Sequence, residues 1–544
     1  MQNYEESVSF LETWGPFQRR VLFSICLTSI PGGYILLSVI FLLASPPHHC
    51  HIPALSNLSQ DWIQASVPVQ HEAGRSERSS CSRYELDLVQ NLSAVENIHN
   101  QNLSVVQLEI LLSNLKQEDC KDGWIYNNEY FESTAATEFS LVCSDQWKIP
   151  LTSLVFFLGG LCGCLLSGQI ADRIGRKPVL FGAITLISVF STALSFAPSW
   201  PVFTLLFFLL GVGQIVGYIV AFVLGSEILM GSTRLLFSNL CLPFVAVISA
   251  MMLPATAYLV RNWRHLTLIM AVPGVACIPL WWLIPESPRW LVSRGRLREA
   301  ELLLRSAAVE NRVEPPQVIF KQIEKTTQKA ESFNILDLLR TTNIRYITLI
   351  LWLIWFSSSL STFGLSFNLS SLNGNPFLNY ILLSAVELPA YVSTWLAARS
   401  LPRRMSYIIF TLLGALALFL IQVTPHSLPA LTLTLVLLVI RNTAMSTCAM
   451  FSRVGSSLSP YLLQLAVFYQ YLPWIVVGSL SLLSILLCVF LPETFRQPLP
   501  DTIQQMKPPK RIRWPGTCIP PAKDDGKSAG NQTTAPEIIC TTHL

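Results

Sequence analysis

The segment GQIADRIGRK, at residues 168–177, joins two long apolar stretches and places four charged residues in a connection too short to be a domain. Its two glycines, Gly168 and Gly175, are expected to let two helix ends approach closely, because glycine has no Cβ. A short charged connection between long apolar stretches is typical of the loops of membrane proteins. The segment therefore predicts a chain that crosses a membrane repeatedly.

The charged residues of this segment suggest an ion-pair latch. Asp172 is expected to cap the following helix and to pair with Arg173 or Arg176 at the membrane surface. The basic residues alone have a second explanation, because cytoplasmic loops collect lysine and arginine. The full pattern Gly-x-x-x-Asp-Arg-x-Gly-Arg-Lys is more specific. It resembles the loop motif of the major facilitator superfamily, which implies an all-α membrane protein with twelve helices in two six-helix bundles and alternating access.

The composition also indicates a membrane protein. Of the 544 residues, 51% are hydrophobic and only 13% are charged, and the mean hydropathy is +0.47. A water-soluble chain of this length could not expose so much apolar surface. The net charge of +4 is small and the basic residues form no single patch, so we expect no nucleic-acid partner. The sequence holds no catalytic motif, so we expect neither an enzyme nor a resident metal or cofactor.

The apolar runs define the spans. The N-terminus, residues 1–20, is expected in the cytoplasm, because the first run follows Arg19 and Arg20 and is too long for a cleaved signal. Six runs are expected to form the first bundle, residues 21–284: about 21–44, 149–169, 178–196, 202–225, 236–260 and 266–284. Six more lie in residues 343–492: about 344–366, 378–398, 406–424, 429–440, 443–467 and 471–491.

A polar segment at residues 45–148 separates the first two spans. Its cysteines and sequons indicate an oxidised, glycosylated, extracellular domain. Four cysteines allow three pairings, and their spacing does not choose among them. A metal site at residues 48–51, HHCH, is less favoured, because Cys50 is better used in a disulfide. The cysteines are Cys50, Cys81, Cys120 and Cys143, and the acceptor asparagines are Asn57, Asn91 and Asn102.

Two polar regions follow the first bundle. Residues 285–342 are expected to form amphipathic helices on the cytoplasmic face, because Leu297, Ala300, Leu303 and Leu304 recur at helical spacing between charged residues. The tail, residues 493–544, is rich in proline, lysine and aspartate and is expected to be disordered in the cytoplasm. Its last three residues, 542–544, match the motif that PDZ domains bind, although three residues often match by chance.

Longer motifs narrow the resemblance. They are FLETWGPFQRR (10–20), TEFSLVCSDQW (137–147), GQIVGYIVAFVLGSEI (213–228), PESPRWL (285–291), NILDLLRTTNIR (334–345), VELPAY (386–391), SRVGSSLSPY (452–461) and LPETF (491–495). Together they resemble solute carrier family 22, and within it the organic cation/carnitine transporters of the novel type. The resemblance covers residues 1 to about 507. It implies a multi-pass plasma-membrane transporter, in contact with lipid, that takes up carnitine-like zwitterions and organic cations, with sodium co-transported in some members.

Arg453 stands at the position whose residue distinguishes the subgroups of the resembled family. It lies about twelve residues after Arg441 at the membrane edge, hence roughly 18 Å deep in a core about 30 Å thick. A guanidinium there costs at least about 2.5–3.5 kcal/mol and needs a partner. In the resembled family an arginine at this place receives the substrate carboxylate. The alternative is a structural arginine satisfied by helix carbonyls or by Glu387.

A quaternary ammonium group is expected to lie against aromatic faces, because it has no hydrogen bond to donate. The resemblance places a cavity-facing tyrosine at Tyr218, whereas simple packing explains any single aromatic residue equally well. Gly217 and Thr362 replace the Asn and Tyr that are common in the family, which weakens the case for carnitine itself. The candidate substrate-binding residues are Arg453, Tyr218, Gln214, Trp352, Trp355, Phe363, Phe367 and Glu387.

A second set of residues matches motifs that, in the superfamily, form charge pairs holding the outward-facing state. An exposed pair contributes only about 0–1 kcal/mol. A network at the seam of the bundles can still bias a conformational equilibrium whose gap is a few kcal/mol. The expected gating residues are Gly168, Asp172, Arg173, Gly175, Arg176, Glu227, Arg234, Glu286 and Arg289.

The second half of the chain is shorter than the first. Arg176 and Arg234 are 58 residues apart, whereas the corresponding Arg404 and Arg441 are 37 apart. The difference is about one transmembrane helix. The run left for the tenth span, 429–440, is only about 18 Å long. We therefore predict a truncated tenth helix and the loss of the family's Thr-Ala-Glu-Leu-Tyr-Pro motif.

Two functions remain open from the sequence. The first is a working transporter of zwitterions or organic cations. The second is a transport-deficient, internally deleted variant that is retained in the endoplasmic reticulum or acts only through partner binding. Uptake of radiolabelled carnitine, measured together with surface biotinylation, separates them.

Overall fold

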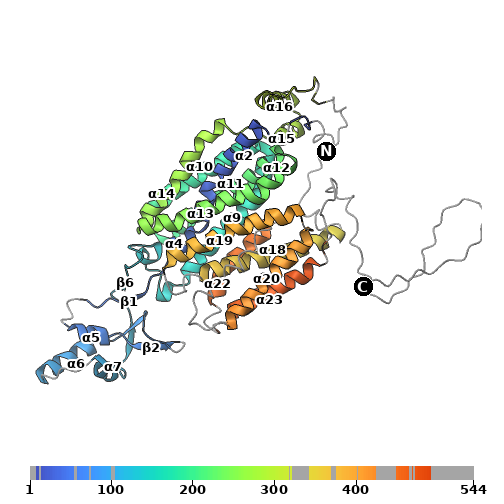
Figure 1. Ribbon diagram of the computed structural model, residues 1–544. Coiled ribbons are helices and arrows are strands. Elements are labelled where there is room, and N and C mark those ends of the chain that lie inside the picture. The colour runs from blue at the N-terminus through green and yellow to red at the C-terminus, as the bar shows by residue number, and fades with distance from the viewer. Residues whose placement is uncertain are drawn as a thin grey trace, which may run out of the picture. The chain divides into compact units, whose positions relative to one another are not determined.

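The computed structural model describes residues 8–11, 14–53, 58–72, 75–99, 105–317, 319–320, 342–368, 375–400, 402–423, 449–464, 469, 472–489 and 491 (Figure 1). Several predictions concern residues outside these ranges. They are the truncated tenth span at 429–440, the disordered tail, the PDZ motif at 542–544, and the acceptor asparagines Asn57 and Asn102.

The first half of the chain contains six spans. In chain order their helices are α2 (Pro16–Thr28), α3 (Ile30–Leu36) and α4 (Ser38–Leu42); α9 (Lys148–Ile174); α10 (Arg176–Ser195); α11 (Trp200–Ile228); α12 (Gly231–Leu236), η3 (Phe237–Cys241) and α13 (Leu242–Leu259); and α14 (Trp263–Cys277) with η4 (Ile278–Trp282). The helices extend past the apolar runs, because the backbone stays helical through the membrane interface.

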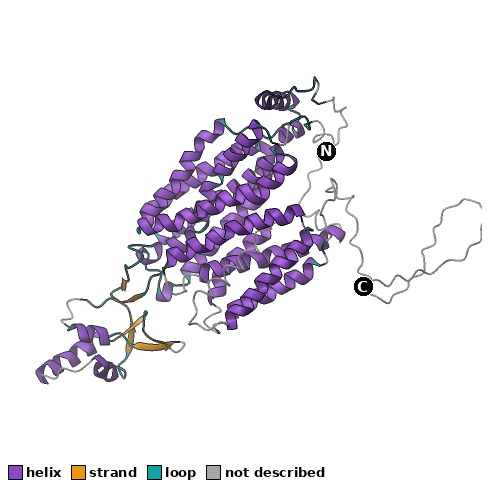
Figure 2. Ribbon diagram, viewed as in Figure 1, coloured by secondary structure: helices purple, strands orange, loops and turns teal. Residues whose placement is uncertain are grey.

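The second half contributes the remaining described helices. They are α18 (Thr342–Asn368), α19 (Pro376–Ser400), α20 (Arg403–Val423), α22 (Ala449–Gln464) and α23 (Leu472–Cys488). Within the described residues, eight helical segments are long and apolar enough to cross a membrane, and two more, Arg404–Leu416 and Leu472–Cys488, are shorter apolar helices. Figure 2 shows strands only away from this helical part. The predicted helical membrane fold is confirmed.

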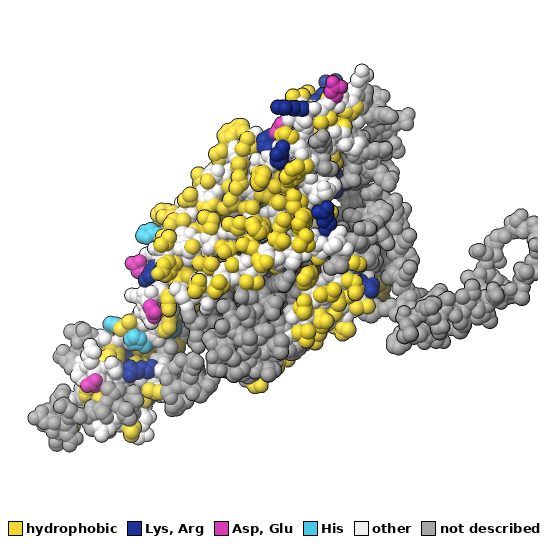
Figure 3. Space-filling model, in the orientation of Figure 1, with side chains coloured by type: hydrophobic (Ala, Val, Ile, Leu, Met, Phe, Trp, Pro, Cys, Tyr) yellow, Lys and Arg dark blue, Asp and Glu magenta, His cyan; other side chains and the backbone are white. Residues whose placement is uncertain are grey.

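The surface of the helical part suits a lipid environment. Figure 3 shows hydrophobic side chains over the sides of the helices and most charged side chains near their ends. Large apolar residues such as Leu205 and Val272 are exposed on these sides. A lipid bilayer accepts such a surface, whereas water would not.

Small residues let the helices approach closely. A Cβ at Gly159 of α9 would collide with the backbone of Phe208 in α11, and a Cβ at Gly455 of α22 would collide with the backbone of Phe356 in α18. Such contacts favour helix packing where lipid offers no hydrophobic driving force. Across the two halves, α9 packs against α22 and α13 packs against α19.

The segment at residues 45–148, named here the loop domain, pairs its strands in three antiparallel two-stranded sheets. The pairs are β1 (His48–Cys50) with β6 (Trp124–Tyr126), β2 (Val69–Glu72) with β3 (Arg75–Arg78), and β4 (Ser82–Tyr84) with β5 (Gln117–Asp119). Its helices are α5 (Gln60–Ala65), α6 (Leu86–His99), α7 (Val105–Leu112), α8 (Ala135–Glu138) and η2 (Cys143–Asp145). Trp62, Val89 and Leu112 contribute to its own small core.

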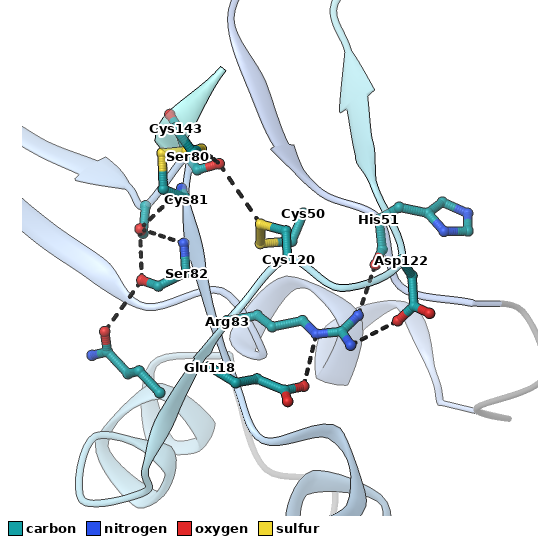
Figure 4. The surroundings of a disulfide bond; sticks show 12 residues. Cys50, His51, Ser80, Cys81, Ser82, Arg83, Glu118, Cys120, Asp122 and Cys143 are labelled. Carbon is teal, nitrogen blue, oxygen red and sulfur yellow. Dashed lines mark hydrogen bonds and ion pairs between the residues drawn. A yellow bond between two sulfur atoms is a disulfide. The ribbon is translucent and has the colours of Figure 1, made fainter. Parts of the chain in front are cut away.

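Two disulfides cross-link the loop domain (Figure 4). The structure pairs Cys50 with Cys120 and Cys81 with Cys143, one of the three pairings that the sequence leaves open. Asn91, the one predicted glycan acceptor within the described residues, is exposed on α6. The domain therefore has the cross-links expected of a small oxidised module.

A buried arginine organises the same domain. Arg83 is 2% exposed. Its guanidinium lies 3.1 Å from a Glu118 carboxylate oxygen and 2.7 Å from one of Asp122, and it donates a hydrogen bond of 2.9 Å to the carbonyl of His51 (Figure 4). A buried guanidinium satisfied in this way joins β4 and β5 to the segment after β1.

The end of the loop domain is fixed to the first six spans. The Thr134 hydroxyl donates to the Ala44 carbonyl at 2.8 Å, and the Trp263 indole N–H donates to the Glu138 carboxylate at 2.7 Å. The Arg264 guanidinium hydrogen-bonds the same carboxylate and holds the pKa of Glu138 below its ordinary value. This segment therefore belongs structurally to the first half.

The polar linker begins with two helices, α15 (Pro288–Ser293) and α16 (Leu297–Asn311). The predicted amphipathic face of α16 is partly wrong, because Ala300 and Leu304 are buried but Leu297 is exposed. The end of α16 contacts the start of α2: the Asn311 side-chain oxygen accepts the Phe17 N–H at 2.9 Å. Through this contact, α16 satisfies a backbone donor in the first turn of α2.

Candidate substrate site and gating residues

Arg453, on α22, lies against the first half of the chain. A Cβ at Gly160 of α9 would be 3.6 Å from the Arg453 Cδ, so the absence of a side chain at Gly160 makes room for the arginine. The guanidinium interacts electrostatically with the Tyr218 hydroxyl on α11 and with Cys164 on α9. Arg453 therefore reaches from one half of the chain to two helices of the other.

No carboxylate neutralises this guanidinium within the described residues. The structure records no ion pair between Arg453 and Glu387, although both are described. The Arg453 Nε is buried and has no hydrogen-bond partner among the described residues. The Nε–H is therefore one donor that could serve an anionic group. Of the two structural alternatives, satisfaction by Glu387 has no support within the described residues, and satisfaction by helix carbonyls is not tested.

Two further candidates lie on different helices. Gln214 of α11 is buried, and its amide N–H donates a long hydrogen bond of 3.4 Å to the Gly32 carbonyl, while its side-chain oxygen has no partner among the described residues. Glu387 of α19 is half-buried and interacts electrostatically with Tyr391, which also interacts with Tyr218. Electrostatic interactions thus connect Arg453 to Tyr218, Tyr218 to Tyr391, and Tyr391 to Glu387.

The aromatic candidates differ in exposure. The Phe363 ring of α18 meets the Phe157 ring of α9 edge-on, with 5.0 Å between centroids. Trp352 is half-buried, whereas Trp355 is buried, as expected of a packing residue. Phe367 belongs to α18, and its side chain lies outside the described residues. Phe363 thus joins the two halves of the chain, whereas the assignment of Trp355 to the substrate site stays a prediction.

Residues 168–177, the latch segment, contribute to a charge cluster at one end of the helices. We name this end, where α15 and α16 lie, the linker end. Arg176 makes two hydrogen bonds of 3.1 Å to the two carboxylate oxygens of Glu227 on α11. It also lies 2.9 Å from an Asp172 carboxylate oxygen. The side chains of Arg176 and Glu227 are only 11% and 15% exposed, so their pairing is partly desolvated.

Glu286 caps α10, and the prediction that Asp172 does so is wrong. The Glu286 carboxylate accepts the backbone N–H groups of Arg176 at 3.0 Å and of Lys177 at 3.2 Å. Asp172 still belongs to α9, so its carboxylate reaches the Arg176 side chain instead. Glu286 thereby supplies a negative charge at a helix N-terminus, where it is stabilising.

The two glycines of the latch segment differ in how closely other atoms approach them. Gly175 has a φ of +122°, and a Cβ there would lie 2.7 Å from a Glu286 oxygen, so the turn requires glycine. The expected close approach at Gly168 is wrong, because a Cβ there would meet nothing within 4 Å. Gly175, and not Gly168, allows the charge cluster to close.

The remaining gating candidates surround this cluster. The Trp290 indole N–H and the Arg294 Nε donate to the Asp172 carbonyl at 2.8 and 3.1 Å, which ties α15 to the end of α9. Arg234 donates to the Leu229 carbonyl at 3.0 Å. Arg289 belongs to α15, and Arg173 is exposed at the end of α9.

An aromatic cluster closes the opposite end of the helices, from which the loop domain projects. Phe377, at the start of α19, is 2% exposed. The rings around it come from α4, the loop domain and α13, with centroids 5.3 to 6.4 Å away: Phe41, Tyr130, Phe131 and Tyr258. One residue of the second half is thus enclosed by four rings of the first half.

Sequence reasoning missed three residues of these sites. Tyr391 lies four residues after Glu387 in the VELPAY segment, so helical spacing could have placed both on one face. Cys164 and Phe377 carry no comparable signal, because their neighbours come from distant parts of the chain.

Comparison with known proteins is consistent with this arrangement. The family described as "Sugar (and other) transporter" matches residues 114–372. The chain is 42% identical to the rat protein named "Organic cation/carnitine transporter 2", with 94% of this chain and 95% of the relative covered. It is 41% identical to mouse "Solute carrier family 22 member 4", covering 94% and 96% of the two chains.

A more distant relative and a solved structure also match. The Drosophila melanogaster protein named "Beta-alanine transporter" is 29% identical over 92% of this chain and 89% of its own length. The xylose transporter XylE of E. coli, in a partially occluded inward-open conformation, aligns with a TM-score of 0.54. This alignment covers 89% of this chain and all of XylE at 14% identity, and it supports the fold alone.

Proposed function

The chain belongs to solute carrier family 22, and we propose that it is a secondary transporter of carnitine-like zwitterions and organic cations, working by alternating access of its two helix bundles. It is a multi-pass membrane protein of a transporter family, not of an enzyme family. The proposal concerns the substrate, its binding site and the coupling.

Arg453 is the observation that supports a carboxylate-bearing substrate. Its guanidinium interacts with Cys164 of α9 and Tyr218 of α11, and its Nε has no partner among the described residues. Holding such a charge inside a membrane protein is costly unless something neutralises it. A substrate carboxylate would do so with charge-assisted hydrogen bonds, which are the strongest that a guanidinium makes.

Other candidate residues suit the cationic end of a zwitterion. Glu387 interacts electrostatically with Tyr391, which also interacts with Tyr218, and its carboxyl group could receive the positive end of a substrate. The tyrosine rings and Phe363 offer aromatic faces, which attract a quaternary ammonium group. A substrate with a carboxylate at one end and an ammonium at the other would therefore complement the site.

We further propose that the protein works at the plasma membrane and that sodium is co-transported. Both parts rest on the resemblance in sequence. The loop domain, with its two disulfides and the exposed Asn91, supports an extracellular side that has passed through the secretory pathway.

The alternative is a transport-deficient, internally deleted variant that is retained in the endoplasmic reticulum or acts only through partner binding, and it rests on the short second half of the sequence. The alignment with the rat relative runs over 538 positions but covers only 94% of the 544 residues, so this chain has no residue at some aligned positions.

Uptake in transfected cells distinguishes the two functions. Radiolabelled carnitine uptake is measured with and without external sodium, and the surface fraction is measured by biotinylation. The transporter proposal expects saturable uptake by surface protein that falls when sodium is replaced. Surface protein without uptake of carnitine or of tetraethylammonium would support the alternative, as would protein confined to the endoplasmic reticulum.

A further inference from the structure

Three side chains with metal-binding chemistry meet in the loop domain. A ring nitrogen of His48 and the sulfur atoms of Cys81 and Cys143 all lie within 4.8 Å of one another. The two sulfurs form one of the two disulfides in Figure 4, so neither is a thiolate in this state. The site is distinct from Arg453 and from the linker-end charge cluster.

The hydrogen bonds of His48 fix its tautomer. Its Nδ1 lies 3.1 Å from the Pro46 carbonyl oxygen, which can only accept, so Nδ1 carries the proton. In the neutral ring Nε2 then holds a lone pair. That atom is buried and has no hydrogen-bond partner among the described residues. Histidines that bind metals are commonly oriented in this way, with the second ring nitrogen donating to a carbonyl.

We propose that reduction of the Cys81–Cys143 disulfide by an extracellular thiol creates a Zn²⁺ site formed by His48, Cys81 and Cys143. Two reductant thiols supply the two electrons and two protons and leave as a disulfide. Zn²⁺ then displaces the protons of both cysteine thiols to solvent, while the neutral His48 releases none. The two thiolates balance the charge of the ion.

The geometry needs only small adjustments. With Zn–S bonds of about 2.3 Å and Zn–N bonds of about 2.0 Å, the one nitrogen and two sulfur ligands of a tetrahedral site lie roughly 3.5–3.8 Å apart. The three atoms already lie within 4.8 Å, and the Cα atoms of the two cysteines are 5.5 Å apart. Side-chain rotation can therefore open the sulfurs around an ion. Water is expected as the fourth ligand, as in zinc sites with three protein ligands.

The position of the site gives it a structural consequence. Cys143 begins η2, shortly before Lys148 begins α9, and α9 carries Gly160 and Cys164 beside Arg453. The Cys81–Cys143 bond thus ties the loop domain to a helix of the candidate substrate site. Zn²⁺ would preserve this tie after reduction, whereas reduction without metal would release it.

Metal binding by the full-length protein tests the proposal. The purified protein in detergent is reduced with a non-chelating phosphine, freed of reductant, and titrated with Co²⁺ as the probe, followed by Zn²⁺. We expect the reduced protein to bind one more ion than the unreduced protein, with thiolate-to-cobalt charge-transfer absorption. The unreduced protein corrects for the free cysteines, and the protein with Cys50 and Cys120 both replaced by serine corrects for the two thiols that reduction of the second disulfide releases.

Variants assign the ligands. His48→Gln is expected to weaken binding at least about tenfold, whereas His49→Gln, whose side chain is exposed, should bind as the parent does. Replacing Cys81 and Cys143 together by serine should abolish the extra ion, and the same change at Cys50 and Cys120 should not. Gel filtration verifies that each variant is folded. Equal binding before and after reduction, or parental affinity in folded His48→Gln, would overturn the proposal.

Discussion

Replacing Phe377 by alanine is expected to open the loop-domain end of the helices. The Phe377 ring is 2% exposed and is enclosed by four rings of the other half. Truncating a buried phenylalanine costs about 3–5 kcal/mol, and each aromatic contact adds about 0.5–1.5 kcal/mol to simple burial. These contacts exist only while the two bundles meet at this end.

The substitution therefore raises the free energy of this closed state more than that of a state open at this end. A differential effect of about 3 kcal/mol corresponds to roughly a hundredfold shift toward the open state. Cys164, half-buried beside Arg453, reports the shift. Its labelling by an impermeant thiol reagent added outside should accelerate by about the same factor, because the rate follows the open population.

Controls separate opening from damage. The difference in labelling between each protein and its Cys164→Ser partner removes the signal of other cysteines. Phe196→Ala removes a phenylalanine that is 72% exposed and should leave the labelling rate unchanged. Phe377→Leu should give an intermediate rate, since it keeps apolar volume but loses the ring contacts. An unchanged rate in Phe377→Ala at normal surface expression would refute the role assigned to this cluster.

The remaining predictions concern charge, pH and topology. Arg176→Ala leaves the largely buried Glu227 without its partner, at a cost of about 3–5 kcal/mol. Maximal uptake should therefore fall at least tenfold, with little change in the half-saturation concentration. The control, Arg173→Ala, should have no effect. Because Arg264 lowers the pKa of Glu138, this ion pair stabilises the folded protein at pH values above the ordinary carboxyl pKa of about 4.3. The stabilisation is lost as the pH falls through the lowered pKa of Glu138. Thermal unfolding of Glu138→Gln should lack this acid-dependent loss of stability. If the short tenth span fails to cross the membrane, the tail lies outside the cell. Asn531 should then be glycosylated in a protein from which the loop-domain sequons have been removed. An antibody to the tail that stains only permeabilised cells would contradict eleven crossings.

The spans were predictable because hydropathy is a local property. Each apolar run that falls within the described residues corresponds to a helix. The helix ends were less predictable, since charged residues continue a helix into the membrane interface. Asp172 illustrates the point: it was expected before the next helix, but the chain remains helical through Ile174.

The sequence identifies the residues of the two sites more readily than the contacts that those residues make. Motifs identified Arg176, Glu227 and Glu286, yet only the fold brings Glu286 to the start of α10 from 110 residues away. Likewise, the cysteines were evident but not their pairing. Arg453 was identified by its charge in an apolar segment, whereas its neighbours Tyr218 and Cys164 depend on how α22 packs on α9 and α11.

Zwitterion uptake by an Arg453→Asp variant is the most direct test of a carboxylate-binding Arg453. Carnitine and tetraethylammonium, a cation without a carboxylate, are compared at equal surface expression in the parent, Arg453→Lys and Arg453→Asp. Removing one partner of a desolvated charge pair costs about 2–5 kcal/mol, so carnitine uptake by Arg453→Asp should fall at least about thirtyfold. Arg453→Lys should retain part of it, and tetraethylammonium uptake should fall much less. Carnitine uptake by Arg453→Asp at the parental rate would contradict the account.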